Sequence, residues 1–343
     1  MSVFARYLAP AFAALAMSFT ASAHAQGSQA DSFDLEAAFD RTLGTQARAP
    51  QTFNAVYEGG LDAAIARVAN GEQGRIGVAA MDLASGRMVS VLGDQRFPMA
   101  STSKIAIAAA YLEGVEKGRW SLSSEFPLLI PERSAKFSSA RAPVRKGNYL
   151  PAIELIELMI TRSSNPATDA LLDVIGGPQA VNDWMRRAGI RDFELTRDIA
   201  TLVRDDGEFD PASVIDRRDS ATPKAMLDLV VGLHEGRWLN ATHRQVILGA
   251  MERTVTGKRR IRGMLPANLT VGNKTGSLNN TTSDIGFIRT PDGRAIALAI
   301  YVTGQGSRAA REARVAEIAR AIYDGYSADS DGRNWTSATY TGG

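Results

Sequence analysis

Apolar residues recur along the chain with two different periods, and these periods predict where helices and strands lie. Leu61, Ile65 and Val68 have helical spacing, so a short amphipathic helix is expected there. Two apolar runs, 75–83 and 88–92, flank a Ser-Gly turn and predict a β-hairpin. After Pro266, three more strand patterns and a closing helix are expected at 268–274, 282–288, 295–302 and 307–326.

The middle of the chain has a mainly helical pattern. Two long loops are expected there, at 123–151 and 196–223. The expected helices are 105–115, 153–161, 167–175, 179–188 and 224–234.

This order of elements predicts an α/β (α+β) fold. The two strand-rich segments, 55–100 and 259–326, would form one discontinuous domain, an antiparallel five-stranded sheet with the terminal helices packed on it. Residues 101–258 would be an inserted all-helical domain, and residues 327–343 a disordered tail. An active site is expected in the crevice between the two parts.

The first residues have the pattern of a secretory signal. Arg6 precedes an apolar run over 8–19, and Ala23-His24-Ala25 ends the segment with an A-x-A cleavage pattern. The run is too short to cross a hydrocarbon core of ~30 Å. We therefore expect a signal peptide over 1–25, cleavage after Ala25, and a periplasmic or secreted protein. Residues 26–54 are expected to be a linker, with a short helix near 33–41.

Composition narrows the classes of function. The 343 residues carry a formal net charge of only +2, which gives no case for a nucleic-acid partner. No later segment is long and apolar enough to span a membrane, so no membrane contact is expected after signal cleavage. The chain has no cysteine and three histidines, so we expect no metal site and no cofactor. A Ser-His-Asp triad would have only His234 and His243 to draw on. A monomer is expected.

Ser101 and Lys104 are the first candidates for chemistry. They are three positions apart, and Pro98 disfavours helix just before them, so a helix should begin near Ser101 with both side chains on one face. A lysine with a depressed pKa can take the proton of a serine hydroxyl. An isolated match of this kind is equally compatible with a capping serine and a solvated lysine.

Two later motifs come in a fixed order behind Ser101. Ser163-Ser164-Asn165 follows a predicted helix, where its polar side chains could pass a proton and hold a substrate amide or simply cap the next helix. Lys274-Thr275-Gly276-Ser277 ends a predicted strand, where it could bind a substrate carboxylate or form a turn.

Together the three motifs resemble the S-x-x-K, S-D-N and K-T-G set of the active-site-serine penicillin-recognising enzymes, class A β-lactamases in particular. The resemblance spans about 61–326. It includes a Gly-Gly-Pro segment at 176–178, the end of an omega loop at 218–223, and the strand pattern at 281–285.

The resemblance implies a role for each motif residue. Ser101 would be acylated, Lys104 would take part in proton transfer, and Ser163 would pass a proton to the leaving nitrogen. Asn165 would hold the amide of the substrate side chain. Lys274 and Thr275 would bind the substrate carboxylate with the support of Arg262, and Gly276 would let the substrate backbone lie against the strand. The backbone N–H groups of Ser101 and Ser277 would form the oxyanion hole.

The sequence departs from the family pattern at two points. Ser164 replaces the aspartate of the second motif. The omega loop lacks the Glu-x-x-Leu-Asn motif whose glutamate activates the deacylating water. Counting back from Pro223 without gaps places Asp206 at the glutamate position, Phe209 at the leucine and Asp210 at the asparagine. The same count places Arg204 at the position of the arginine that pairs with the aspartate closing the loop, here Asp219.

Asp206 is one methylene shorter than glutamate, and Glu208 could reach the water instead if the loop is shifted. Both could also belong to a solvated acidic loop. The predicted function is therefore a serine β-lactamase that hydrolyses small β-lactams through a Ser101 acyl-enzyme, with deacylation by an atypical omega-loop carboxylate, Asp206 or Glu208. The alternatives are a penicillin-binding DD-peptidase or esterase relative with slow deacylation, and a non-catalytic penicillin-binding sensor.

Overall fold

A computed structural model describes residues 47–48 and 60–330 of the chain, which belong to one compact unit. The predicted signal peptide, most of the linker and its short helix lie outside the described residues, as do residues 331–343. None of the described helices is long and apolar enough to cross a membrane.

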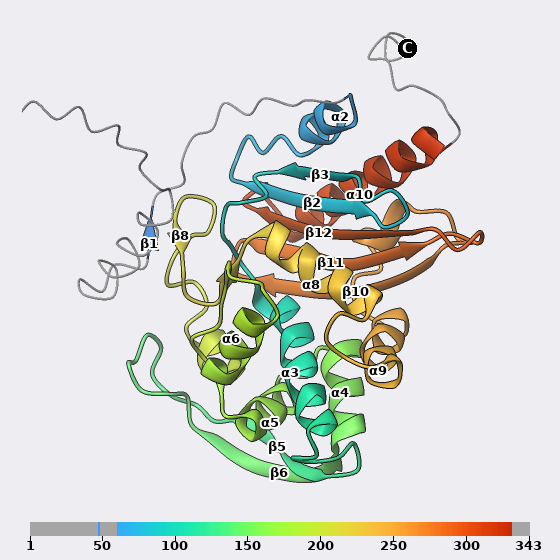
Figure 1. The fold of residues 1–343 in the computed structure, drawn as a ribbon. Helices are drawn as coiled ribbons and strands as arrows, with labels where there is room; N and C mark the ends of the chain where they lie inside the picture. Colours follow the sequence, from blue (N-terminus) through green and yellow to red (C-terminus); the bar gives the residue numbers. More distant parts are fainter. Residues whose placement is uncertain (1–46, 49–59, 331–343) are drawn as a thin grey trace, which may run out of the picture. The chain divides into compact units, whose positions relative to one another are not determined.

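A five-stranded antiparallel sheet forms the upper part of the molecule in Figure 1, as predicted. Its strand order is β10-β11-β12-β2-β3, so the first hairpin joins the last three strands through the β12–β2 pair. The bounds are β2 Ile76–Asp82, β3 Met88–Val91, β10 Thr270–Leu278, β11 Thr281–Arg289 and β12 Ala295–Thr303.

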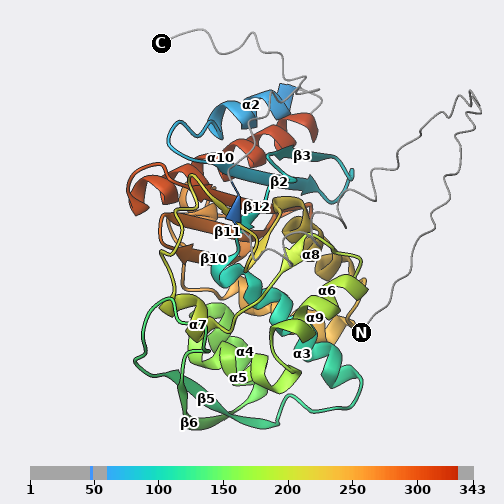
Figure 2. The same cartoon turned by 90° about the vertical axis from the view of Figure 1, so that its left-hand side faces the viewer.

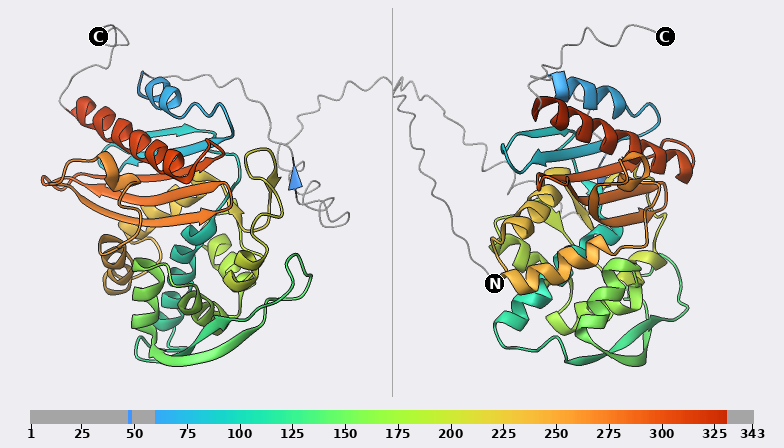
Figure 3. Two further views of the ribbon diagram at one scale, coloured as in Figure 1. Left: turned by 180° about the vertical axis from the view of Figure 1, so that it is seen from behind. Right: turned by 90° about the vertical axis from the view of Figure 1, so that its right-hand side faces the viewer.

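Both faces of this sheet are buried. Along β12, Ala297, Ala299 and Tyr301 contribute to one core, and the alternate residues Ile296 and Ile300 contribute to a second. The first core continues into α8, Pro223–Glu235, and the second into α2, Gly60–Val68, and α10, Arg308–Ser330. Figure 3 shows α10 crossing the face of the sheet that lies opposite α8. Alternate residues of β12 thus face opposite cores, and the second core attaches α2 and α10 to the sheet.

The helical part lies below the sheet in Figure 1. Its apolar helices pack around α3, which is buried along most of its length. The bounds are α3 Lys104–Glu116, α4 Ala152–Thr161, α5 Asn165–Ile175, α6 Pro178–Arg187, α7 Ile199–Arg204 and α9 Ala241–Glu252, with 3-10 turns η1 Ala100–Ser103 and η2 Ile261–Met264.

The two predicted loops contain regular structure. Residues 123–151 form an antiparallel ribbon of two strands, β5 and β6, and residues 196–223 contain α7 and two short strands, β8 and β9. β6 is largely exposed and polar, so it lacks the apolar alternation that identifies a half-buried strand. The tail prediction was also wrong at its start, because α10 continues through 327–330. The remaining strands are β1 Ala47–Arg48, β4 Phe97–Pro98, β5 Glu125–Pro131, β6 Val144–Pro151, β7 Phe193–Glu194, β8 Ile215–Asp216 and β9 Ser220–Ala221.

Candidate active site

Ser101 lies in the 3-10 turn between β4 and α3. The turn is held at both sides, since the Thr102 N–H donates to the Met99 carbonyl at 3.1 Å and the Met99 N–H donates to the Asp219 carbonyl at 2.9 Å. Ala100 has a φ of 49°, in the left-handed region that L-residues rarely adopt. The Ser101 side chain is partly exposed. The surrounding structure therefore fixes the backbone of this serine, and the residue stays partly exposed.

Lys104 is fully buried one turn after Ser101. Its Nζ donates to the Ser163 carbonyl and to Asn165 Oδ1, both at 2.7 Å, and lies 3.3 Å from Ser163 Oγ. Burial, and then the nearby charge of Lys274, lowers the pKa of Lys104 well below its usual value. Asp169 acts in the opposite direction. The first two motifs are therefore in direct contact.

Lys274 brings the third motif to the same hydroxyl. Its Nζ donates to Ser163 Oγ at 3.0 Å and to the Thr275 carbonyl at 2.9 Å. Burial lowers the pKa of Lys274 to about 7, although Asp284 raises it. Ser163 itself has a φ of 58°, so its backbone is held in an unfavourable conformation. The structure thus sets one serine hydroxyl between two buried lysines.

The replacement of aspartate by Ser164 leaves this arrangement intact. Ser164 is the N-cap of α5, and its hydroxyl accepts the N–H of Ala167 at 3.3 Å. The alternative role considered for the Ser-Ser-Asn motif, capping of the next helix, is therefore performed by Ser164 alone. Ser163 and Asn165 remain turned toward Lys104.

Gly276 lets strand β10 approach the nucleophile's turn. A Cβ at this position would lie 2.3 Å from Ser283 Oγ and 2.8 Å from the Met99 carbonyl oxygen, which is closer than real contacts allow. On the same strand, the Thr275 hydroxyl is 2.8 Å from that of Thr256. The strand edge that would receive a substrate backbone therefore lies directly beside the Ser101 turn.

Arg262 contacts β10 ahead of the third motif, at Val271 and Asn273. Its guanidinium donates to Asn273 Oδ1 at 3.0 Å and to backbone carbonyls, including that of Glu252 at 3.0 Å. Arg260, two residues earlier, donates instead to the Gly276 carbonyl at 2.8 Å and to Ser277 Oγ at 2.7 Å. Of the two arginines in the Arg-Ile-Arg sequence, Arg260 therefore contacts the third motif, whereas Arg262, the arginine named from the sequence, contacts the preceding part of β10.

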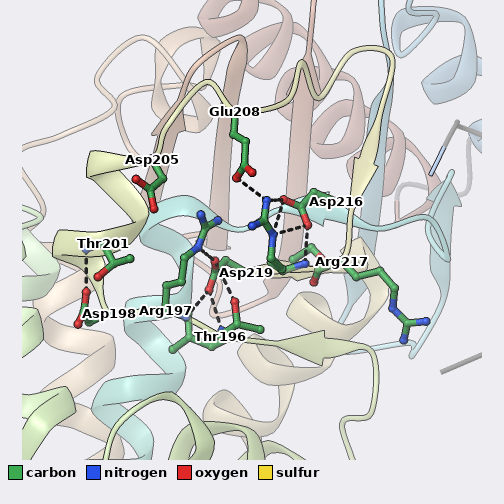
Figure 4. Close-up of polar contacts among 12 residues, drawn as sticks. Thr196, Arg197, Asp198, Thr201, Asp205, Glu208, Asp216, Arg217 and Asp219 are labelled. Carbon is green, nitrogen blue, oxygen red and sulfur yellow. Dashed lines mark hydrogen bonds and ion pairs between the residues drawn. The ribbon is translucent and has the colours of Figure 1, made fainter. Parts of the chain in front are cut away.

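The arginine that pairs with the closing Asp219 is Arg197, and the prediction of Arg204 was wrong. Arg197 Nε lies 2.6 Å from Asp219 Oδ2, and the backbone N–H groups of Thr196 and Arg197 donate to the other carboxylate oxygen (Figure 4). Arg204 instead forms an ion pair with Asp205 at 2.7 Å. The extra length of the omega loop therefore follows α7, whereas counting back without gaps assigned it to the entrance.

This pairing changes the register of the loop. In the family pattern the glutamate comes two residues after the arginine and the leucine three residues after the glutamate. Starting from Arg197, these positions are Ile199 and Leu202, both of which are buried. The carboxylate of Asp169, on α5, accepts the N–H groups of Ile199 and Ala200 at 2.7 and 2.9 Å, which holds α7 in this register.

The predicted loop carboxylates have other contacts. Asp206 accepts the backbone N–H of Asn279 at 2.9 Å, and Glu208 forms an ion pair with Arg218 at 2.6 Å. Both line a pocket under the loop that also includes Phe209, and Ser101 is not among its lining residues. Asp210 accepts from the side-chain amide of Asn280 at 2.8 Å. Asp206 and Asp210 therefore attach the loop to the β10–β11 turn, and Glu208 pairs with an arginine of the loop itself.

The histidines lie outside this site. His234 packs edge-on against Phe287, and His243 Nδ1 lies 2.8 Å from Glu116 Oε1 near the N-terminus of α9. Among residues 60–330, no group of three or more acidic or histidine side chains is arranged to hold a metal ion.

Known proteins share this sequence and fold. The model of the β-lactamase enzyme family matches residues 60–326. β-Lactamase CTX-M-8 of Citrobacter amalonaticus is 33% identical over 74% of this chain and 84% of its own, and an imipenem-hydrolysing β-lactamase of Enterobacter cloacae is 31% identical over 73% and 84%. A crystal structure of a β-lactamase from Chitinophaga pinensis has a TM-score of 0.68 and 27% identity, with 78% of this chain and 99% of that chain covered.

The solved structure of an ancestral class A β-lactamase is also similar to this chain, with a TM-score of 0.64 and 33% identity, and the match covers 77% of this chain and 99% of that chain. The family match covers well over half of the sequence, and the solved structures have the same fold. The prediction of a class A-like serine hydrolase is thereby confirmed. The chain belongs to the β-lactamase enzyme family, in its class A branch.

Proposed function

We propose that the protein is a serine β-lactamase that opens the lactam ring through a Ser101 acyl-enzyme, with deacylation as its slow step. The Ser101 oxygen bonds to the lactam carbonyl carbon, the ring carbon–nitrogen bond breaks, and the hydroxyl proton ends on the ring nitrogen. The proposal is carried by the Ser163 hydroxyl, which lies 3.3 and 3.0 Å from the Lys104 and Lys274 amines. A hydroxyl so held can accept a proton on one side and deliver it on the other.

Lys104 is the proposed base for acylation. An uncharged amine has two N–H donors and one lone pair, and the two oxygen atoms at 2.7 Å use both donors. The lone pair is then left to accept the Ser101 proton. Burial supports this form of Lys104, since removal from water disfavours the ammonium.

The proposed substrate pose uses the edge of β10. Lys274 and Thr275 bind the substrate carboxylate, and the backbone N–H groups of Ser101 and Ser277 stabilise the oxyanion. We assign the supporting arginine to Arg260, because its guanidinium contacts the Ser277 hydroxyl at 2.7 Å. This replaces the expectation for Arg262.

Deacylation needs a base that activates water. Asp206 and Glu208 stay candidates, but each carboxylate is already engaged, with the Asn279 N–H and with Arg218. Ile199 occupies the position of the family's glutamate and has no basic atom. This residue favours a second candidate function, a penicillin-binding DD-peptidase or esterase relative whose acyl-enzyme persists. The non-catalytic sensor has less support, since it would not need a buried lysine beside Ser101.

The proposal extends to the protein's surroundings. We propose that the signal sequence over 1–25 directs export and that cleavage follows Ala25. The mature protein would then act as a monomer in the periplasm or medium, on small β-lactam molecules.

The test follows a chromogenic cephalosporin and the intact mass of the mature protein together. We expect a burst of colour equal to the enzyme concentration, an adduct on Ser101, and then slow turnover. Ser101→Ala should lose both colour and adduct. Fast turnover without an adduct would contradict slow deacylation, and the absence of an adduct and of colour would contradict the whole proposal. If Asp206→Asn or Glu208→Gln slows the second phase, that carboxylate is the base.

A further inference from the structure

A cavity of about 270 Å³ opens beside the proposed catalytic groups. Asn165, which contacts Lys104, lines it together with Ile199 from α7. The opposite wall comes from the segment that connects β5 to β6. Because Asn165 belongs to both the site and the cavity, a substrate held by its amide would extend into this space.

The connecting segment is fastened to α7 along its length, and Figure 2 shows the two side by side. Arg204 donates to the carbonyls of Ala140 and Ser138 at 2.9 and 2.8 Å, while its ion pair with Asp205 neutralises its charge. Three further hydrogen bonds, of 2.7 to 2.8 Å, run from Phe137 N to Asp205, from Arg141 Nε to Asp198, and from Ala142 N to Thr201. The cavity wall is therefore preorganised.

The charge on this wall is positive, because two exposed cations outnumber one carboxylate. Arg133 and Lys136 line the cavity, are exposed, and make no ion pair or side-chain hydrogen bond within the described part of the chain. Glu132 is the single acidic residue on the same wall, and Arg204 is already paired with Asp205. An anion in the cavity would meet two cations that form no ion pair within the described residues, and a single carboxylate.

We infer that this cavity is a subsite for the acyl side chain of a β-lactam and that it selects side chains that carry an anionic group. The inference rests on the proposed function of Ser101. Asn165 Oδ1 accepts from Lys104, so the amide N–H groups of Asn165 remain to donate to the carbonyl of the substrate's acylamino group. The acyl group beyond that carbonyl then contacts apolar Ile199 on one side and the charges of Arg133 and Lys136 on the other.

Two penicillins that differ by one carboxylate test this inference. Carbenicillin is benzylpenicillin with a carboxylate on the α-carbon of its side chain, so the ratio of their second-order rate constants for acylation isolates the effect of that charge. The rate constants come from the intact mass of Ser101 adducts after rapid quenching. We expect a ratio that favours carbenicillin and falls about fivefold for each cation removed, which is the scale of two unit charges in contact in water. The ratio should also fall as salt screens the charges.

The test variant is Arg133→Gln with Lys136→Gln, and the control is Arg145→Gln with Lys146→Gln on β6, which changes the net charge equally but lies outside the cavity lining. A ratio that falls in the test variant and holds in the control supports the subsite. A ratio that is unchanged in the test variant, or that falls equally in the control, overturns it. If neither penicillin acylates Ser101 in the unmodified protein, the proposed function itself fails. A circular-dichroism spectrum and a urea unfolding midpoint equal to those of the unmodified protein verify that the test variant is folded.

Discussion

Replacing Ile199 by glutamate should convert slow deacylation into faster turnover. The arginine–aspartate pair of the omega loop sets the register in which residue 199 takes the place of the family's water-activating glutamate. Ile199 also lines the cavity next to Asn165, so a longer polar side chain has space on the side of the proposed site. The Ile199→Glu variant therefore supplies a base without changing Ser101, Lys104 or Lys274.

The size of the effect follows from two opposing contributions. A positioned general base accelerates a step by about 10²–10⁴-fold. Ile199 is only 2% exposed and its N–H donates to the carboxylate of Asp169, so a glutamate here is partly desolvated and close to a like charge. Both effects raise the pKa of the new carboxyl, and we expect about 10²-fold faster deacylation at pH 8. Loss of the apolar side chain should cost roughly 2 kcal/mol of folding free energy.

The assay is the decay of the Ser101 adduct, followed by intact mass after excess benzylpenicillin is removed. The rate constant for decay should increase with pH in the Ile199→Glu variant, because only the ionised carboxylate accepts the proton of water. Ile199→Gln is the matched control, since glutamine has the same length and no basic atom. Equal decay in the two variants, with normal acylation in both, would refute the assignment of position 199.

Three further outcomes follow from the geometry. Gly276→Ala should slow acylation at least tenfold and lower the unfolding free energy by about 1–3 kcal/mol, since its Cβ would meet the Met99 carbonyl at 2.8 Å; normal acylation would contradict this. Arg197→Gln should destabilise the fold by about 3 kcal/mol in urea unfolding, because Asp219 is left buried without its cation. For Lys274, whose folded pKa of about 7 lies below its unfolded value of 10.5, the unfolded chain binds more protons between these pH values. The stability of the natural protein relative to Lys274→Met should therefore rise with pH from 7 to 10, by up to about 1.4 kcal/mol per unit, and parallel curves would contradict it.

The sheet could be predicted from sequence because burial on two faces leaves a strong apolar signal. Every residue of β12 is buried, and the predicted strand over 295–302 differs from the observed one by a single residue at its end. The β5–β6 ribbon gives no such signal. Its strands pair with each other and most of β6 is exposed, while the apolar residues of β5 that pack against the helical core, Phe126, Leu128 and Leu129, are only partly buried.

The omega loop could not be aligned from sequence for a different reason. Several arginines precede Asp219, and sequence alone does not say where a longer loop has gained its residues. In the structure the register of the loop is set by a contact with a residue distant in the sequence, because the Asp169 carboxylate on α5 accepts the backbone N–H of Ile199. The ordered motifs predicted Ser101, Lys104, Ser163 and Lys274, and the structure brings the last three into contact, with Lys104 at the start of α3 and Lys274 in the middle of β10.

Asp169 also accounts for an apolar residue at position 199. Its carboxyl is buried, which raises its pKa to about 6, and both its oxygen atoms are used by the N–H groups of Ile199 and Ala200. A second carboxylate at 199 would add like-charge repulsion at a site where the first is already costly to ionise. The two positions are therefore coupled, and Asp169→Asn should lower the pKa of the new carboxyl in the Ile199→Glu background and accelerate decay of its adduct at neutral pH. The same substitution alone should not accelerate decay, since it supplies no base. Equal acceleration in both backgrounds would mean that Asp169 acts on the adduct by a route other than its charge on residue 199.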